Sequence, residues 1–218
     1  MAFRATDGGN FAVQTGRNIQ KGIGIDMDII IATNNAHKVE EFKRILTPLG
    51  FQVFSLKDKG IRVEIDENGS TFAENAMIKA QTIYDMVHLP VIADDSGLCV
   101  DALDGRPGIY SARYGGEGLD DHGRNLKLLE ELKGITDRSG RFVCSIAYID
   151  AEGTKHSFEG VCEGIIGFEE KGVNGFGYDP LFLVGEKSFA QLSGAEKDAL
   201  SHRGKANRLL CAYIAEHQ

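Results

Sequence analysis

Cysteine is scarce in this chain of 218 residues, and no two cysteines are close together. The four are Cys99, Cys144, Cys162 and Cys211, each among apolar neighbours and none in a C-x-x-C pair. Zinc sites and disulfide frameworks need closer or paired spacing, so neither is predicted. Free buried thiols are typical of a reducing compartment, and we therefore expect a cytoplasmic protein.

Long apolar runs and a surplus of positive charge are also missing. No apolar stretch approaches the length of a membrane span, so no membrane partner is predicted. Lys and Arg number 24 against 32 Asp and Glu, a formal net charge of −8. A sequence-independent nucleic-acid binder needs a basic face, so no nucleic-acid partner is predicted either. A small nucleotide remains possible, because a few cations and a metal can hold phosphates inside an acidic protein.

Residues 1–26 have neither a basic-then-apolar signal pattern nor any periodicity, and they are rich in Gly, Asn and Gln. We expect them to be a leader or an extension added to the native chain, poorly ordered, with Met27 a plausible native start. The whole chain, with 218 residues and a hydrophobic content of 42%, is large enough for one large domain or for two lobes around one cleft, and residues 27–218 are predicted to form that unit.

Hydrophobic periodicity beyond Met27 switches between strand and helix patterns. Strands are predicted at residues 28–33, 51–56, 91–93, 142–149, 155–163 and 181–184. Helices are predicted after the first strand, after Thr71, after Asp120 or Asp121, and at the C-terminus. Strands alternate with helices early in the chain and an antiparallel hairpin follows, which predicts a mixed α/β fold.

The segment between the first predicted strand and helix, Thr33-Asn34-Asn35-Ala36-His37-Lys38, is a candidate anion site. Free backbone N–H groups and the positive end of the helix dipole meet at such a point. Acids are expected in the first helical turn, and Glu40 and Glu41 follow. The P-loop pattern Gly-x-x-x-x-Gly-Lys is absent. On these residues alone, a capped helix with a solvated lysine is therefore favoured.

Two adjacent carboxylates, Asp94 and Asp95, follow the apolar run 90–93, where the predicted strand 91–93 ends. Neighbouring strand residues face opposite sides, so one carboxylate should face a cleft and the other a cap or a backbone N–H. One of them, with a carboxylate from the upstream acids Glu64, Asp66 and Glu67, could bind Mg²⁺. This ion takes one or two protein oxygens and completes its shell with water and phosphate. Hydrogen bonds within a turn explain the two aspartates equally well.

Glycines flank an aromatic residue in the segment Gly175–Pro180. They would allow the backbone to approach a flat ligand on which Phe176 could stack. A tight loop with Phe176 folded into the core is the commoner arrangement for such a segment, and it is favoured on these residues alone.

Cationic and polar residues gather near the C-terminus. Lys197 and Ser201 are four residues apart on one helical face, and His202 and Arg203 follow at a break marked by Gly204. Lysine and arginine together suit a phosphate or a carbonyl acceptor. A solvated helix end would have the same composition.

The joint order of five motifs resembles the inosine triphosphate pyrophosphatase family, enzymes that hydrolyse non-standard purine nucleoside triphosphates. The motifs are ATNNAHKVEEF, GSTFAENAMIKA, ADDSGLCVDALDGRPGIYSARYGG, GFGYDP and SHRG, spread from Asp28 to the C-terminus. The combination of ADDSGL with PGIYSARY is specific to this family. The family often has Thr-Gly-Asn where this chain has Thr33-Asn34-Asn35.

The resemblance implies an α/β fold with a long, mixed, twisted central sheet, helices on both sides, and two lobes with a substrate cleft between them. Residues 27–218 would form this single catalytic domain, and the protein would be a homodimer. Water would attack the α-phosphate of ITP, dITP or XTP, giving a nucleoside monophosphate and pyrophosphate. The activity would remove these compounds from the nucleotide pool.

The resemblance also implies roles for individual residues. Glu67 and Asp95 would hold Mg²⁺, and Asp95 is also the candidate base, with Asp94 as the alternative. Ser96 would contact the substrate. The triphosphate would be bound by Thr33, Asn34, Asn35, Ala36, His37 and Lys38. The base pocket would be formed by Phe176, Gly177, Tyr178 and Asp179, with Phe176 stacked on the purine. Lys197 would meet phosphate or base, and His202 and Arg203 would contact the base edge.

Two other functions are compatible with these motifs. One is a related pyrophosphatase that removes modified pyrimidine or methylated nucleotides. The other is a nucleotide-sensing module without turnover, which would make the intact acidic cluster dispensable. A phosphatase with an aspartyl intermediate is not favoured, because no D-x-D-x-[TV] motif follows a strand.

Overall fold

The strand β1 (Met27–Ile31) opens the part of the chain that the computed structural model describes, residues 27–116 and 118–217. Its isoleucines are fully buried, as expected for a parallel strand covered by helices on both faces. β1 pairs in parallel with β2 (Phe51–Ser55) on one side and with β3 (Val91–Val100) on the other.

The remaining strands are antiparallel. β3 pairs along its whole length with β4 (Ser139–Ile149), which forms a hairpin with β5 (Lys155–Ile166). β6 (Phe182–Val184) and β7 (Lys187–Ser188) complete a seven-stranded sheet of order β2-β1-β3-β4-β5-β6-β7. The sheet is therefore mixed, with its parallel and antiparallel parts joined at β3.

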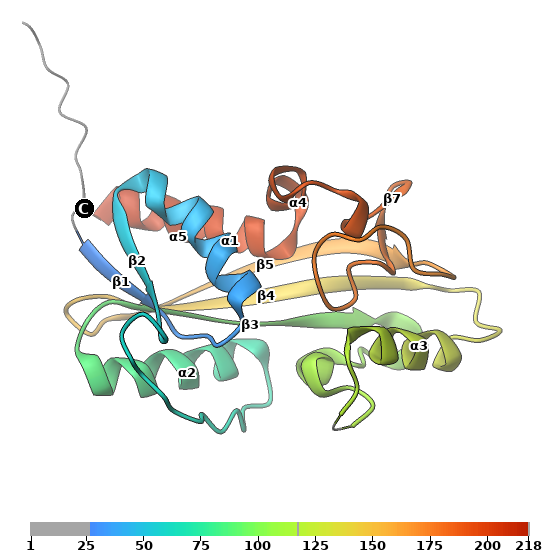
Figure 1. Cartoon of the computed structure of the whole chain (residues 1–218), viewed down its shortest axis with the longest axis horizontal. Helices are drawn as coiled ribbons and strands as arrows, with labels where there is room; N and C mark the ends of the chain where they lie inside the picture. Colours follow the sequence, from blue (N-terminus) through green and yellow to red (C-terminus); the bar gives the residue numbers. More distant parts are fainter. Residues whose placement is uncertain (1–26, 117, 218) are drawn as a thin grey trace, which may run out of the picture.

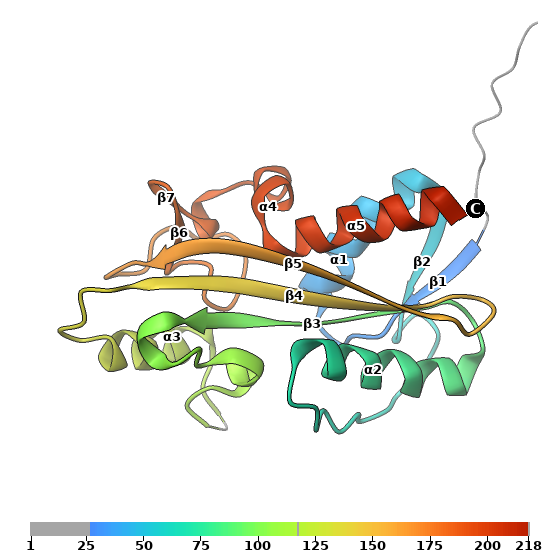
Figure 2. The same ribbon diagram turned by 180° about the vertical axis from the view of Figure 1, so that it is seen from behind.

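Helices cover both faces of the sheet (Figures 1 and 2). α1 (Ala36–Leu46), α4 (Gly194–Leu200) and α5 (His202–His217) lie on one face, and α2 (Phe72–Val87) and α3 (Asp121–Glu131) lie on the other. Short 3₁₀ helices are Thr47–Leu49, Asp101–Leu103, Gly108–Arg113 and Phe189–Gln191. None of the helices in the described ranges is long and apolar enough to cross a membrane.

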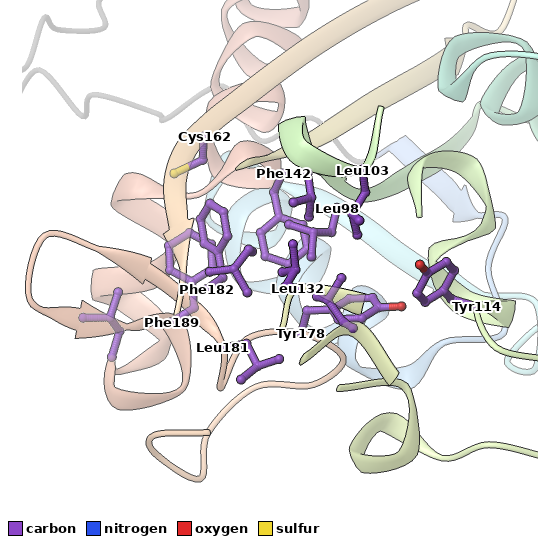
Figure 3. Packing of buried hydrophobic residues seen from close by; sticks show 14 residues of the cluster. Leu98, Leu103, Tyr114, Leu132, Phe142, Cys162, Tyr178, Leu181, Phe182 and Phe189 are labelled. Atoms are coloured by element: carbon purple, nitrogen blue, oxygen red, sulfur yellow. The ribbon is translucent and has the colours of Figure 1, made fainter. Parts of the chain in front are cut away.

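An aromatic cluster fixes the end of the sheet near α3 (Figure 3). The ring centroid of Phe142 lies 4.6 Å from that of Phe182 and 5.9 Å from that of Phe189. Leu128 and Leu132 from the α3 region pack into the same cluster and are fully buried. Such packing of large side chains makes this end of the molecule a rigid support for the segment that precedes β6.

The predicted fold class is confirmed, because a mixed sheet is flanked by helices on both faces. The division into two lobes and the single domain over residues 27–218 stay predictions, and the prediction for residues 1–26 falls outside the described residues. Two local predictions were wrong. β3 does not end at Ala93 but continues to Val100, because β4 pairs with all of it. The break before α5 lies at Ser201, and Gly204 is inside α5, where a Cβ would collide with the backbone of Asp198.

Candidate active site

Asp94 and Asp95 lie in the middle of β3, opposite Ile146 and Ser145 of β4. Ile92 packs with residues of α1 and α5, whereas Ala93 packs with residues of α2. Because side chains alternate along a strand, Asp94 shares the first face and Asp95 the second. The prediction that the two carboxylates face opposite sides is therefore confirmed.

Asp94 is buried between two cations. Its Oδ2 atom lies 2.9 Å from Nζ of Lys38 and 3.2 Å from Nε of Arg203. Burial acts to raise the pKa of Asp94, but the charges of Lys38, Arg203 and Lys79 outweigh it and hold this pKa well below its usual range. The expectation that the inward aspartate meets a cap or a backbone N–H was wrong, because its polar partners are side chains: Lys38 of α1, Arg203 of α5 and the hydroxyl of Ser96, which donates at 3.3 Å.

Asp95 has a different surrounding, built by α2. Nζ of Lys79 lies 3.2 Å from Oδ1 of Asp95 and 2.8 Å from Oε2 of Glu67. The Asn75 side-chain amide donates to Oδ2 of Asp95 at 3.3 Å. Burial raises the pKa of Asp95, and Lys79 and Lys38 only partly offset this effect. Two carboxylates from separate segments thus meet at one ammonium group.

A cavity of about 630 Å³ opens beside Asp95. Its lining includes all of the predicted site residues except Ala36 and Asp94: Thr33, Asn34, Asn35, His37, Lys38, Glu67, Asp95, Ser96, Phe176, Gly177, Tyr178, Asp179, Lys197, His202 and Arg203. Predicted site residues from four of the five motifs, together with Glu67 and Lys197, are therefore brought to one place by the fold.

The start of α1 forms one wall of this cavity. Asn35 caps the helix, since its Oδ1 atom accepts from the backbone N–H of His37 at 2.9 Å and of Lys38 at 3.3 Å. The first turn of α1 contains no acid, contrary to expectation. Glu41 is instead one turn further and points into the protein.

Glu41 is a buried residue that sequence reasoning assigned only to the helix start. Its carboxylate accepts a hydrogen bond from Nη1 of Arg203 and lies 3.6 Å from Nζ of Lys197. Lys197 in turn donates to Oδ2 of Asp179 at 2.6 Å. Burial acts to raise the pKa of Glu41, but Arg203 and Lys197 lower it below its ordinary value. The one feature of the sequence that could have pointed to a role for Glu41 in the site is its position inside the motif ATNNAHKVEEF.

An aromatic stack connects two distant segments at the cavity. The rings of His37 and Phe176 are 5.2 Å apart and nearly parallel, at 16°. Nζ of Lys197 lies 4.8 Å from the centroid of Phe176. Phe176 is only half-buried and lines the cavity, so the expectation that it folds into the core was wrong. A flat ligand could replace His37 or extend this stack.

Two residues of α3, neither of which was predicted as a site residue, hold the backbone beside Phe176. Oδ2 of Asp121 accepts from the backbone N–H of Gly177 at 2.7 Å, and Nδ2 of Asn125 donates to the carbonyl of Gly177 at 3.2 Å. Gly177 has φ +62°, the left-handed region that favours glycine. Asn125 also donates to Glu170 at 2.6 Å. In the sequence, the spacing of four residues between Asp121 and Asn125 indicates only that they share a helix face, and not that they contact Gly177.

His202 lies at the first turn of α5 with its ring stacked on Phe142, the centroids 4.7 Å apart. Burial, together with the charges of Arg203 and Lys197, lowers the pKa of His202 well below its usual value. The Nδ1 atom of His202 is buried and has no hydrogen-bond partner among the described residues. A neutral imidazole facing the cavity can offer one donor and one acceptor to a ligand.

The carboxylates of Glu67 and Asp95 are the best candidates for a divalent cation. No group of three or more His, Cys, Asp or Glu side chains within residues 27–116 and 118–217 could hold a metal. Mg²⁺ does not need such a group, because it binds through one or two carboxylates and otherwise keeps water and phosphate oxygens. The pair already surrounds one cation, the ammonium of Lys79, so its donors fit a hard metal ion.

Fold and cavity together define a class of protein: an α/β ligand-binding protein whose cavity combines paired carboxylates, buried cations and an aromatic face. That combination suits a nucleotide, with phosphates at the cations and a base at the aromatic ring. The chain belongs to the Ham1 family, whose model matches residues 29–213. The resemblance inferred from the five motifs is thereby confirmed.

Individual relatives agree with this assignment. A dITP/XTP pyrophosphatase of Leptospira interrogans is 48% identical over 182 residues, which cover 82% of this chain and 92% of the relative. A dITP/XTP pyrophosphatase of Bacillus licheniformis is 52% identical over 192 residues, covering 86% and 97%. The solved structure of the Staphylococcus aureus Ham1 protein has a TM-score of 0.80 and 41% identity, covering 88% of this chain and 100% of that one.

Proposed function

We propose that this protein is a Mg²⁺-dependent pyrophosphatase that hydrolyses ITP, dITP and XTP to the nucleoside monophosphate and pyrophosphate. The observation that carries the proposal is the meeting of Glu67 and Asp95 at one cation, inside a cavity lined by the segment 33–38. The names of the relatives, dITP/XTP pyrophosphatases, support the same activity. Removal of non-standard purine nucleotides from the cytoplasmic pool is the corresponding role.

In this proposal the triphosphate lies along the start of α1. Phosphoryl transfer requires position and charge from the protein rather than covalent chemistry. Lys38 and Lys79 line the cavity near the two aspartates and supply positive charge. Thr33, Asn34 and Asn35 supply polar groups on the same wall. Ser96, which accepts from Nη2 of Arg203 at 2.9 Å, is available as a further contact.

Asp95 is the proposed base. It lines the cavity and its pKa is raised, whereas Asp94 is buried behind it and is kept ionised by Lys38 and Arg203. A carboxylate that faces the reacting water and can take a proton suits general-base work. Asp94 then serves to hold the two cations in place.

Glu67 and Asp95 would hold Mg²⁺. When bound, the ion would neutralise phosphate oxygens and lower the pKa of a bound water. Lys79 would have to leave the position between the two carboxylates to make room for it.

Selectivity for the base is proposed to depend on His202, Arg203 and the segment 176–179. Hypoxanthine and xanthine have an oxygen at C6, where adenine has an amine. A buried hydrogen-bond donor of the protein can pair with that oxygen. With adenine bound, the same donor would be left unpaired, which costs about 1–3 kcal/mol of binding free energy. Phe176, supported by Asp121 and Asn125, would stack on the purine. A homodimer is proposed from the resemblance alone, and a cytoplasmic location from the free cysteines.

The decisive experiment incubates the protein with ITP, dITP, XTP, the four ordinary triphosphates and modified pyrimidine triphosphates, with and without Mg²⁺. The expected result is monophosphate and pyrophosphate from ITP, dITP and XTP, only with Mg²⁺. Diphosphate and phosphate as products, or preference for a modified pyrimidine, would contradict the proposal. Binding of ITP without any turnover would indicate a sensing module instead.

A further inference from the structure

A second pocket of about 510 Å³ also borders the segment that follows β1. We call it the adjoining pocket; it is lined by Thr33, Asn34, Ala36, Val39, Glu40, Lys43, Ser55, Lys57, Gly60, Ile61 and Arg62. Thr33 and Asn34 also line the cavity of the candidate active site, so the two hollows share this wall. A small anion leaving one hollow therefore lies next to the other.

Positive charge in the two hollows is compensated differently. Within the cavity, Lys38, Lys79 and Lys197 each lie within 2.9 Å of a carboxylate oxygen. Arg203 is held by Glu41 and Asp94. Arg113 also lines the cavity and is exposed. Its guanidinium lies over the ring of Tyr110, and it has no ion-pair partner among the described residues.

The adjoining pocket has three cations, Lys43, Lys57 and Arg62, against one lining carboxylate, Glu40. Lys43 is 3.8 Å from Glu40 and 3.9 Å from Asp58, both long contacts. In the described ranges neither Lys57 nor Arg62 has an ion-pair contact, and the carboxylate of the neighbouring Asp58 acts on Lys57 only at longer range. In a chain with a formal net charge of −8, uncompensated cations around a hollow are a local attraction for an anion.

The rim that carries Lys57 is held by its own hydrogen bonds. Oδ2 of Asp58 accepts from the backbone N–H of Ser55 at 2.9 Å, and Oγ of Ser55 accepts from the N–H of Asp58 at 3.1 Å. The N–H of Ile61 donates to the carbonyl of Leu56 at 2.9 Å. Because the turn is closed by these bonds, the backbone at Lys57 is already ordered, and binding has to order only the side chain.

We infer that the adjoining pocket binds the pyrophosphate product, and that Lys57 and Arg62 are its anchoring residues. The inference rests on the proposed function, since that reaction releases pyrophosphate at the shared wall. Pyrophosphate is compact, multiply charged and without an apolar part, which matches a hollow whose special feature is uncompensated positive charge. Retained pyrophosphate would then slow the next turnover, so the pocket sets the strength of product inhibition.

The test uses the double variant Lys57→Gln/Arg62→Gln and the control Lys59→Gln. Lys59 is in the same turn but pairs with Asp28 at 3.0 Å and does not line the pocket. Calorimetric titration with sodium pyrophosphate gives a dissociation constant, and pyrophosphate inhibition of ITP hydrolysis gives an inhibition constant. Both constants should rise about tenfold in the double variant, equivalent to about 1.4 kcal/mol. In the control both should stay within twofold.

The Michaelis constant for ITP separates this site from the triphosphate site. It should rise less than the pyrophosphate constants in the double variant. An equal rise would overturn the inference, as would pyrophosphate constants within twofold of the unchanged protein.

Inorganic phosphate, titrated in parallel, should bind more weakly, and its dissociation constant should change less in the double variant. Equal behaviour of phosphate and pyrophosphate would contradict pyrophosphate as the ligand. Pyrophosphate binding that depends on Lys57 and Arg62 in a protein unable to cleave ITP would refute the proposed function alone.

Discussion

Asp94 and Asp95 are chemically identical neighbours with opposite surroundings. Asp94 is enclosed by Lys38 and Arg203 and does not line the cavity, whereas Asp95 lines it and shares Lys79 with Glu67. Their pKa values move in opposite directions for that reason. Two adjacent acids on one strand can therefore have different roles, one as a structural ion-pair partner and one as a reactive group. The reason is that the two faces of the strand meet different helices.

The largest expected effect comes from Asp95→Asn. Loss of a general base should lower kcat for ITP by about 10²–10⁴-fold. Release of pyrophosphate measures the effect, and circular dichroism with thermal melting serves as the control for folding. A folded Asp95→Asn protein with near-normal turnover would contradict the division of roles.

Asp94→Asn should act on stability first. Removing one member of a buried ion-pair network leaves Lys38 without its ion-pair partner and Arg203 with Glu41 alone, and such changes cost about 3–5 kcal/mol. Urea unfolding measures the loss, and Asp95→Asn is the matched control because it removes the same charge one residue away. Equal unfolding free energies for the two variants would contradict the structural role assigned to Asp94.

Lys79→Met tests the Asp95 face alone. Because the ammonium occupies the space between Glu67 and Asp95, its removal should lower the Mg²⁺ concentration that half-saturates the protein by about tenfold. Melting temperature recorded against Mg²⁺ concentration, without nucleotide, provides the measurement. Lys59→Met is the control, since Lys59 pairs with Asp28 on the surface. An unchanged or weaker Mg²⁺ response would place the metal elsewhere.

Asn125→Leu tests whether the support of Gly177 from α3 contributes to substrate binding. One lost hydrogen bond of about 1 kcal/mol should raise the Michaelis constant for ITP about fivefold and leave kcat nearly unchanged. His122→Ala removes another contact to Glu170 from the same helix without touching Gly177, and serves as the control. Steady-state kinetics of both variants gives the answer; an equal effect of the two would assign the role to Glu170.

The last expected effect concerns pH. His202 has a folded pKa well below 6.5, so below pH 6.5 the unfolded chain takes up a proton that the folded protein does not. Stability should therefore fall as pH decreases, by about 1.4 kcal/mol at pH 5.5 from this group. Unfolding free energies at pH 7.5 and 5.5 measure it, and His202→Asn should show a correspondingly smaller drop. The same drop in both proteins would mean that His202 is protonated in the folded state.

Sequence patterns predicted most strands and the residue types of the site, because burial imposes a local period and the motifs are short. They missed partners that are distant in the chain. Arg203 contacts Glu41 across 162 positions and Asp94 across 109, and neither pairing has a local signature. Asn75 and Lys79 were present in a quoted motif, but their spacing indicated only a helix. The end of β3 was misplaced because charged residues inside a buried strand become tolerable only when cations from other elements meet them.

By itself the sequence determined the alternation of strands and helices, the family, and the inventory of acids, cations and aromatic residues available for chemistry. The tertiary structure alone decided which aspartate faces the cavity, that one lysine bridges Glu67 and Asp95, and that the cations of Lys57 and Arg62 stay uncompensated beside Thr33 and Asn34. The physical reason is that periodicity along a strand fixes only that neighbours face opposite sides. What each side meets depends on the helices that pack there, and these come from positions far away in the chain.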